Sequence, residues 1–185
     1  MKKNVAVFCG ARAGLPSYTA AAQAFMQRAH NEGWGLVYGG GDVGLMGVFA
    51  DEMLKIGGNV IGVIPEHLVK WEVAHKGLSD LRVVDDMHSR KKMMYDESHA
   101  FVIFPGGIGT LDEFFEVLTW KQLGHHSKPI ALFNLDGYFD GLLTWWLRAV
   151  KDGLYSPEQM SLFTVCKNLD ELNVFLEESD PHDVA

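Results

Sequence analysis

The chain has few of the features that define extracellular or membrane proteins. Only two of its 185 residues are cysteines, Cys9 and Cys166, and they form neither a CxxC pair nor a metal-ligand spacing. This scarcity excludes a disulfide framework and favours a reducing, cytoplasmic environment. No apolar run approaches the ~18 residues that a membrane-spanning helix needs, so we expect no transmembrane segment and no membrane partner.

Basic residues are also in deficit. Sixteen lysines and arginines stand against twenty-four acidic residues, which gives a formal net charge of −8. This sign of charge repels phosphate backbones, so we expect no nucleic-acid partner. A small anionic ligand is still compatible with it, because a local pocket of backbone amides and arginines can outweigh the net field.

Several catalytic motifs are missing. The absence of a GxSxG elbow argues against a Ser-His-Asp hydrolase, and the glycine run at 39–47 lacks the Lys-Ser/Thr of a P-loop. The eight histidines form no HExxH pair, and we interpret His125 and His126 as a polar helix end. We therefore expect neither a metal nor a cofactor.

Short apolar runs alternate with helical stretches along the whole chain. Such alternation is typical of right-handed crossovers and a mainly parallel sheet covered on both faces. The pattern predicts a single Rossmann-like three-layer α/β/α domain over 1–185, with a frayed polar end at 180–185. The predicted strands are 4–9, 35–38, 59–64, 81–84, 100–104 and 129–133, and the predicted helices are 17–31, 44–56, 88–98, 109–123, 138–152 and 170–179.

Glycine is abundant, with 20 residues, and it gathers in three loops at 9–14, 38–47 and 105–110. Each loop follows a predicted strand, and ligands of open α/β sheets bind beyond the carboxyl ends of the strands. We therefore expect all three loops along one edge of the sheet. Gly10, Gly40, Gly41 and Met46 are candidate phosphate or loop contacts in the first two loops.

The third loop has two interpretations. Gly106 and Gly107 permit a tight turn before Gly109 and Thr110 open a helix, so free backbone amides and the helix dipole predict a phosphate cradle. Alternatively, Thr110 is the N-cap of a capping box that Glu113 completes. The capping box does not explain why three glycines precede it.

Charged residues flank this loop. Glu113, Glu116 and Trp120 share one face of the predicted helix, either as a solvated acidic face or as partly enclosed carboxylates. Upstream, Arg90 and Lys91 belong to the only concentrated basic cluster, at 88–94. A solvated helix start is the simple explanation, but cations are disfavoured at a helix N-terminus.

These motifs together resemble the LOG (Lonely Guy) family of cytokinin riboside 5′-monophosphate phosphoribohydrolases, long labelled lysine decarboxylase-like. The similarity rests on the PGGxGTxxE pattern at 105–113, on the RK pair at 90–91, and on the YGGG and GLMG patterns at 38–41 and 44–47. The family's first loop usually reads CGS, whereas this chain has Ala11 in place of the serine.

The resemblance implies Arg90 and Glu113 as the catalytic pair. It also implies the following substrate-binding residues: Glu72, Arg90, Lys91, Gly106, Gly107, Ile108, Gly109, Thr110, Leu111, Asp112 and Glu116. In such an enzyme Arg90 would contact the phosphate or assist the departing base.

The implied reaction cleaves the N-glycosidic bond of a nucleoside 5′-monophosphate, releasing a free base and ribose 5-phosphate without a cofactor. Alternatives are a nucleosidase for AMP or other common nucleotides, and a non-catalytic nucleotide or cofactor carrier of the same fold. The resemblance also implies a homodimer, with higher assemblies possible. Aromatic residues at Phe114, Phe115, Trp120, Trp145 and Trp146 are the expected source of its interface.

Overall fold

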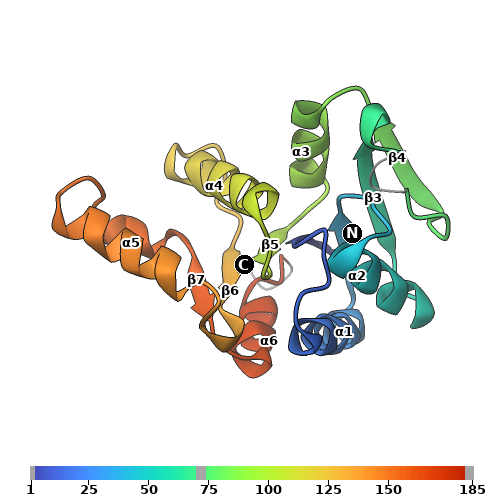
Figure 1. Ribbon diagram of the computed structural model, residues 1–185, viewed down its shortest axis with the longest axis horizontal. Helices are drawn as coiled ribbons and strands as arrows, with labels where there is room; N and C mark the ends of the chain where they lie inside the picture. The colour runs from blue at the N-terminus through green and yellow to red at the C-terminus, as the bar shows by residue number, and fades with distance from the viewer. Residues whose placement is uncertain (1–2, 70–73, 182–185) are drawn as a thin grey trace.

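Strands and helices alternate through the computed structural model, which describes residues 3–69 and 74–181 (Figure 1). The strands are β1 (Lys3–Phe8), β2 (Trp34–Tyr38), β3 (Val60–Pro65), β4 (Asp80–Val84), β5 (Ala100–Ile103), β6 (Ile130–Phe133) and β7 (Thr164–Cys166). The α-helices are α1 (Pro16–Asn31), α2 (Gly44–Lys55), α3 (Met87–Asp96), α4 (Ile108–Gln122), α5 (Asp140–Lys151) and α6 (Leu169–Glu178). Short 3-10 helices are η1 (Glu66–Leu68), η2 (Leu135–Gly137) and η3 (Pro157–Leu162).

The strands form one sheet in the order β4-β3-β2-β1-β5-β6-β7, and every adjacent pair is parallel. The chain builds outward from β1 to β4 and then returns to place β5 on the other side of β1. Val5 of β1 consequently pairs with Leu36 of β2 on one side and with Ala100 of β5 on the other. The reversal of strand order between β1 and β5 is a topological switch point, where open α/β sheets hold their ligands.

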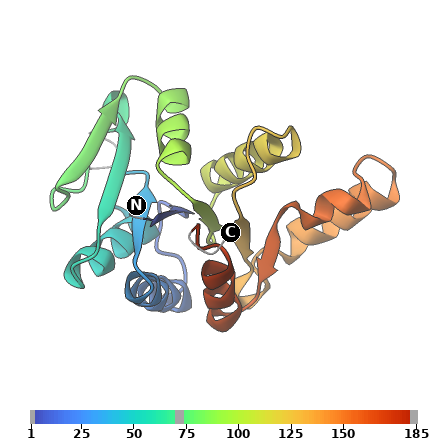
Figure 2. The same ribbon diagram turned by 180° about the vertical axis from the view of Figure 1, so that it is seen from behind.

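Both faces of the sheet are covered, because successive strand residues point to opposite faces and nearly all are apolar. Val5 and Val7 pack with α1, α2 and α6, whereas Ala6 and Phe8 pack with α3, α4 and α5. Figures 1 and 2 show the two helix layers on either side of the sheet. This arrangement confirms the predicted Rossmann-like three-layer fold.

The strand β7 was not predicted. It has three residues, lies at the edge of the sheet and passes from an exposed through a partly buried to a buried position, so it has no apolar run of its own. The prediction of a frayed end at 180–185 is wrong at its first residue, because Asp180 forms an ion pair with Lys3. Residues 182–185 lie outside the described part of the chain.

No helix in the described ranges is long and apolar enough to cross a bilayer. Helix α5 spans only twelve residues and includes Asp140, Arg148 and Lys151. Its buried Trp146 packs against the rings of Phe114 and Phe163.

Candidate active site

The three glycine loops meet at the switch point, as the sequence predicts. The Gly10 N–H donates to the Pro105 carbonyl at 3.1 Å, and the Leu45 N–H donates to the Gly10 carbonyl at 3.2 Å. Gly44, with a φ of +58°, lies so close to the first loop that a Cβ would come within 2.3 Å of the Ala11 carbonyl carbon. Direct backbone contact therefore holds the loops after β1, β2 and β5 together.

The capping-box interpretation of the third loop is wrong. Helix α4 begins at Ile108 with Gly107 as its N-cap, and no side chain caps it. Thr110 is already the third helical residue and is 3% exposed, with its hydroxyl 2.1 Å from where a Gly106 Cβ would lie. Gly106 is thus needed so that Thr110 can pack beneath the turn.

A helix that starts in this way leaves its first N–H groups without intrahelical acceptors and places the positive end of its dipole there. Among the described residues, a Cβ at Gly107 or Gly109 would meet no atom within 4 Å other than those of its chain neighbours and its own helix backbone, so the space above these amides is open. The local structure therefore suits an anion at the α4 N-terminus.

A cavity of about 250 Å³ lies beside this N-terminus. It brings together residues from five separate segments of the chain. Its lining consists of Cys9, Ala11, Met46, Leu68, Met87, Arg90, Gly107, Gly109, Thr110, Asp112 and Glu113. Arg90, Glu113 and Met46 of the predicted site residues thus share one cavity with the α4 N-terminus.

Arg90 lies inside the protein, which contradicts the interpretation of its cluster as a solvated helix start. Its residue is 4% exposed, and its Nη2 donates to the Gly39 carbonyl at 3.0 Å. Arg90 lies in the first turn of α3, which begins at Met87. Asp86 is the N-cap of this helix and accepts the Ser89 N–H at 2.7 Å. The helix therefore aims Arg90 into the cavity across from the β2 loop.

Lys91, the next residue of α3, pairs with two carboxylates of α4. Its Nζ lies 2.6 Å from Asp112 Oδ2 and 3.0 Å from Glu116 Oε2. Burial lowers the pKa of Lys91, but the hydrogen bonds and charges of Asp112 and Glu116 outweigh this and raise it overall. Lys91 therefore stays charged and pairs with both Asp112 and Glu116, whereas Glu113 lines the cavity together with Arg90.

Cys9 is buried beside Glu113. Burial raises the pKa of its thiol well above the ordinary value, and the negative charge of Glu113 raises it further. The thiolate is the nucleophilic form of cysteine, so this shift makes Cys9 an apolar wall of the cavity and not a nucleophile.

Other predicted site residues lie elsewhere. Gly40 and Gly41 do not line the cavity, because the Gly40 carbonyl accepts the His75 N–H at 3.0 Å and Gly41 bridges to Ala74. Leu111 packs against the hydrophobic core, and Ile108 is 88% exposed. Glu72 lies outside the described residues.

The structure also adds residues that sequence reasoning missed. A second cavity, of about 350 Å³, shares Gly107 with the first and is also lined by Gly10, Tyr18 and Tyr138. The Tyr138 hydroxyl donates to the Gly106 carbonyl at 2.7 Å, from 32 residues away in the sequence. No local pattern around Tyr138 signals this contact.

A parallel sheet of this topology, with a glycine turn and a helix N-terminus at its switch point, defines a Rossmann-like class of α/β protein. Comparison with known proteins narrows the class. The family model described as "Possible lysine decarboxylase" matches residues 46–174.

Similar curated proteins are named cytokinin riboside 5′-monophosphate phosphoribohydrolase. LOG7 of Arabidopsis thaliana is 42% identical over 180 residues, covering 97% of this chain and 83% of the relative. The protein of that name from Rhodococcoides fascians is 45% identical over 170 residues, covering 91% and 86%. The chain belongs to this LOG, or lysine decarboxylase-like, family.

Solved structures show the same fold at lower identity. The molybdenum cofactor binding protein from Rippkaea orientalis superposes with a TM-score of 0.72 at 20% identity, covering 96% of this chain and 97% of that one. The molybdenum cofactor carrier protein from Chlamydomonas reinhardtii gives 0.71 at 18% identity, covering 97% and 98%. At this identity the likeness concerns the fold alone.

Proposed function

We propose that this protein hydrolyses the N-glycosidic bond of cytokinin-type nucleoside 5′-monophosphates to the free base and ribose 5-phosphate. The relatives that span nearly the whole chain carry this activity in their names. The observation that carries the proposal is the cavity in which Glu113, Arg90 and the α4 N-terminus meet.

The phosphate binds at the α4 N-terminus in this proposal. Free N–H groups and the helix dipole favour a dianion there, and the open space above Gly107 and Gly109 lets it approach the backbone. Ala11, which also lines the cavity, supplies no hydroxyl, so the backbone is the main donor. Binding energy from this unreactive group positions the ribose for the chemical step.

Glu113 acts on the sugar. The bond between C1′ and the base nitrogen breaks, positive charge develops on the ribose ring, and water delivers its hydroxyl to C1′ and a proton to the base. A carboxylate beside C1′ stabilises the cation and orients the water. Arg90, in the same cavity, either binds the phosphate or assists the departing base.

Incubation with three compounds tests the proposal: isopentenyladenosine monophosphate, AMP and adenosine. We expect the free base from isopentenyladenosine monophosphate and none from adenosine, because adenosine offers no phosphate to the α4 N-terminus. Faster release from AMP would assign the protein to general nucleotide hydrolysis. Binding of the monophosphates without release of any base would identify a carrier.

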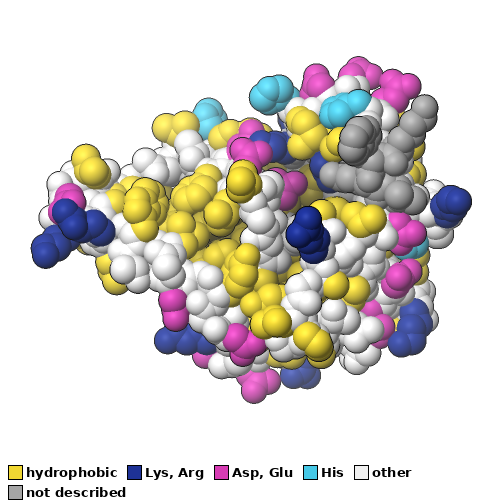
Figure 3. Space-filling model, viewed as in Figure 1, with side chains coloured by type: hydrophobic (Ala, Val, Ile, Leu, Met, Phe, Trp, Pro, Cys, Tyr) yellow, Lys and Arg dark blue, Asp and Glu magenta, His cyan; other side chains and the backbone are white. Residues whose placement is uncertain are grey.

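The protein is proposed to act as a cytoplasmic homodimer, with higher assemblies open. Phe114 and Trp146, two of the aromatic residues considered above for an interface, are buried in the monomer core. Trp145 and Leu154 are 56% and 83% exposed beside an apolar groove between α4 and α5. Figure 3 shows hydrophobic side chains gathered over these helices. Large exposed apolar patches commonly mark association surfaces.

The buried thiols of Cys9 and Cys166 are consistent with a reducing compartment.

A further inference from the structure

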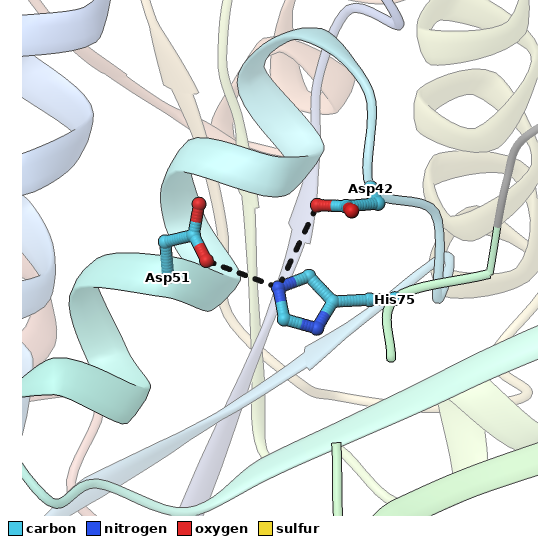
Figure 4. Close-up of side chains that lie close together, drawn as sticks. All are labelled: Asp42, Asp51 and His75. Carbon is cyan, nitrogen blue, oxygen red and sulfur yellow. Dashed lines mark hydrogen bonds and ion pairs between the residues drawn. The ribbon is translucent and has the colours of Figure 1, made fainter. Parts of the chain in front are cut away.

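A buried histidine fastens the chain before β4 onto α2. The His75 residue is 6% exposed, and its Nε2 lies 3.1 Å from Asp51 Oδ1 on α2 and 3.7 Å from Asp42 Oδ1 in the loop before that helix. Figure 4 shows the imidazole ring between the two carboxylates. The other ring nitrogen, Nδ1, accepts the Gly77 N–H at 3.1 Å.

The arrangement is that of a hydrogen-bonded anchor and not of a metal site. Because Nδ1 accepts from Gly77, the neutral ring carries its proton on Nε2 and donates it to Asp51. A metal ion would need the lone pair of the same Nε2 atom. The carboxylates instead orient a donor, and the ring closes the 74–77 segment against α2.

This anchor connects to Arg90 through the backbone of the β2 loop. The His75 N–H donates to the Gly40 carbonyl at 3.0 Å, and the preceding residue, Ala74, bridges to Gly41. The neighbouring Gly39 carbonyl accepts from Arg90 Nη2 at 3.0 Å, so tightly that a Cβ on Gly39 would lie 2.0 Å from that nitrogen. A shift of the 39–41 turn therefore moves the guanidinium acceptor directly.

We propose that His75 is a positioning residue for Arg90: its side chain, held by Asp51, fixes the 39–41 turn whose Gly39 carbonyl orients the guanidinium in the cavity. The expected effect of His75 on kcat/KM rests on the proposed function, because it requires that the protein is a hydrolase. The positional link itself stands on the hydrogen bonds alone and is testable without turnover.

Two substitutions separate the anchor from the rest of the side chain. In His75→Asn the amide ends at the depth of Nδ1, so it keeps an acceptor for Gly77 but does not reach Asp51. In His75→Gln the amide extends to the depth of Nε2 and can still donate to Asp51. We expect kcat/KM to fall on the order of tenfold to a hundredfold in His75→Asn, as for a displaced catalytic group. His75→Gln should recover most of this loss.

Glu52→Gln is the matched control for stability. Glu52 is the next residue on α2, is 3% exposed, and accepts a hydrogen bond from Gln27 at 2.7 Å, away from the 39–41 turn. Its substitution should lower the thermal midpoint while leaving kcat/KM, measured well below that midpoint, near the wild-type value. An equal loss of activity in Glu52→Gln would show that general destabilisation is enough, and would overturn the inference.

A double-mutant cycle tests whether His75 acts through Arg90. With Arg90→Lys already present, adding His75→Asn should reduce kcat/KM by less than twofold, because the group to be positioned is gone. If His75→Asn lowered kcat/KM in the Arg90→Lys protein as much as it does in the wild type, the inference would be overturned. Stoichiometric Zn²⁺ in the purified protein that His75→Asn lacks would also overturn it, because the cluster would then hold a metal.

A spectroscopic measurement keeps the two proposals distinguishable. We expect the Nε–H NMR signal of Arg90 to shift in His75→Asn and to stay in place in Glu52→Gln. Such a shift in a protein without turnover would refute the proposed function and leave the positional link intact. An unmoved Arg90 signal in His75→Asn would overturn the link whatever the activity.

Discussion

Replacing Gly109 by alanine should raise stability and lower activity. Gly109 is the second residue of α4, lines the cavity, and has open space where a Cβ would lie. Glycine in a helix lowers the free energy of unfolding by about 0.5–1 kcal/mol relative to alanine, because glycine loses more backbone entropy on folding. For a chain of this length, that gain corresponds to a rise of about 1–4 °C in the thermal midpoint.

In the proposed binding mode, the same methyl group occupies the space of the substrate phosphate. A hydrogen bond to a charged group contributes about 1.5–3 kcal/mol, and losing one such bond reduces kcat/KM by about 10- to 150-fold. The substitution thus separates folding from binding, since the two effects have opposite signs.

Gly141→Ala is a matched control. Gly141 is the second residue of α5 and likewise has open space for a Cβ, but it lies outside both cavities beside the α4 N-terminus. We expect the same gain in midpoint and no change in base release from isopentenyladenosine monophosphate. Wild-type kcat/KM in Gly109→Ala would refute the placement of the phosphate at the α4 N-terminus.

Three further outcomes are expected. Glu113→Gln should lower turnover by orders of magnitude with little change in thermal midpoint, because Glu113 lies in the second turn of α4 and not at its cap; retained turnover would refute its catalytic role. Burial lowers the pKa of His126, whose Nδ1 accepts the Lys128 N–H. The neutral ring of His126 therefore contributes fully to the free energy of unfolding above the ordinary histidine pKa of about 6.5, and this contribution is lost as the pH falls below that value. The fall in midpoint between pH 7.5 and 5.5 should be smaller in His126→Asn than in the wild type, and an equal fall would contradict this assignment. Light scattering should give a mass of about twice 20.6 kDa for the wild type. The double variant Trp145→Ser/Leu154→Ser should give the mass of a monomer, and a monomeric wild type would refute the dimer.

The amino-acid sequence alone determined the layer architecture and the edge that carries the site. Strands such as 100–103 are apolar throughout because both of their faces are buried, and that pattern is local. The glycines of the 105–110 loop likewise signal a tight turn into a helix. The sequence could not distinguish a side-chain cap from a backbone turn at Thr110, because both interpretations use the same residues. The packing of Thr110 beneath Gly106 decided it.

Only the tertiary structure decided which charged groups face the cavity. Arg90 and Lys91 are adjacent in sequence, yet one donates to the Gly39 carbonyl and the other pairs with Glu116. Their partners lie 51 and 25 residues away, in opposite directions along the chain. The His75 anchor is similar, because its partner Asp51 is 24 residues distant on another element. Periodicity reports burial within one segment, whereas these contacts depend on the order in which the parallel strands pair, and that order exists only in the folded sheet.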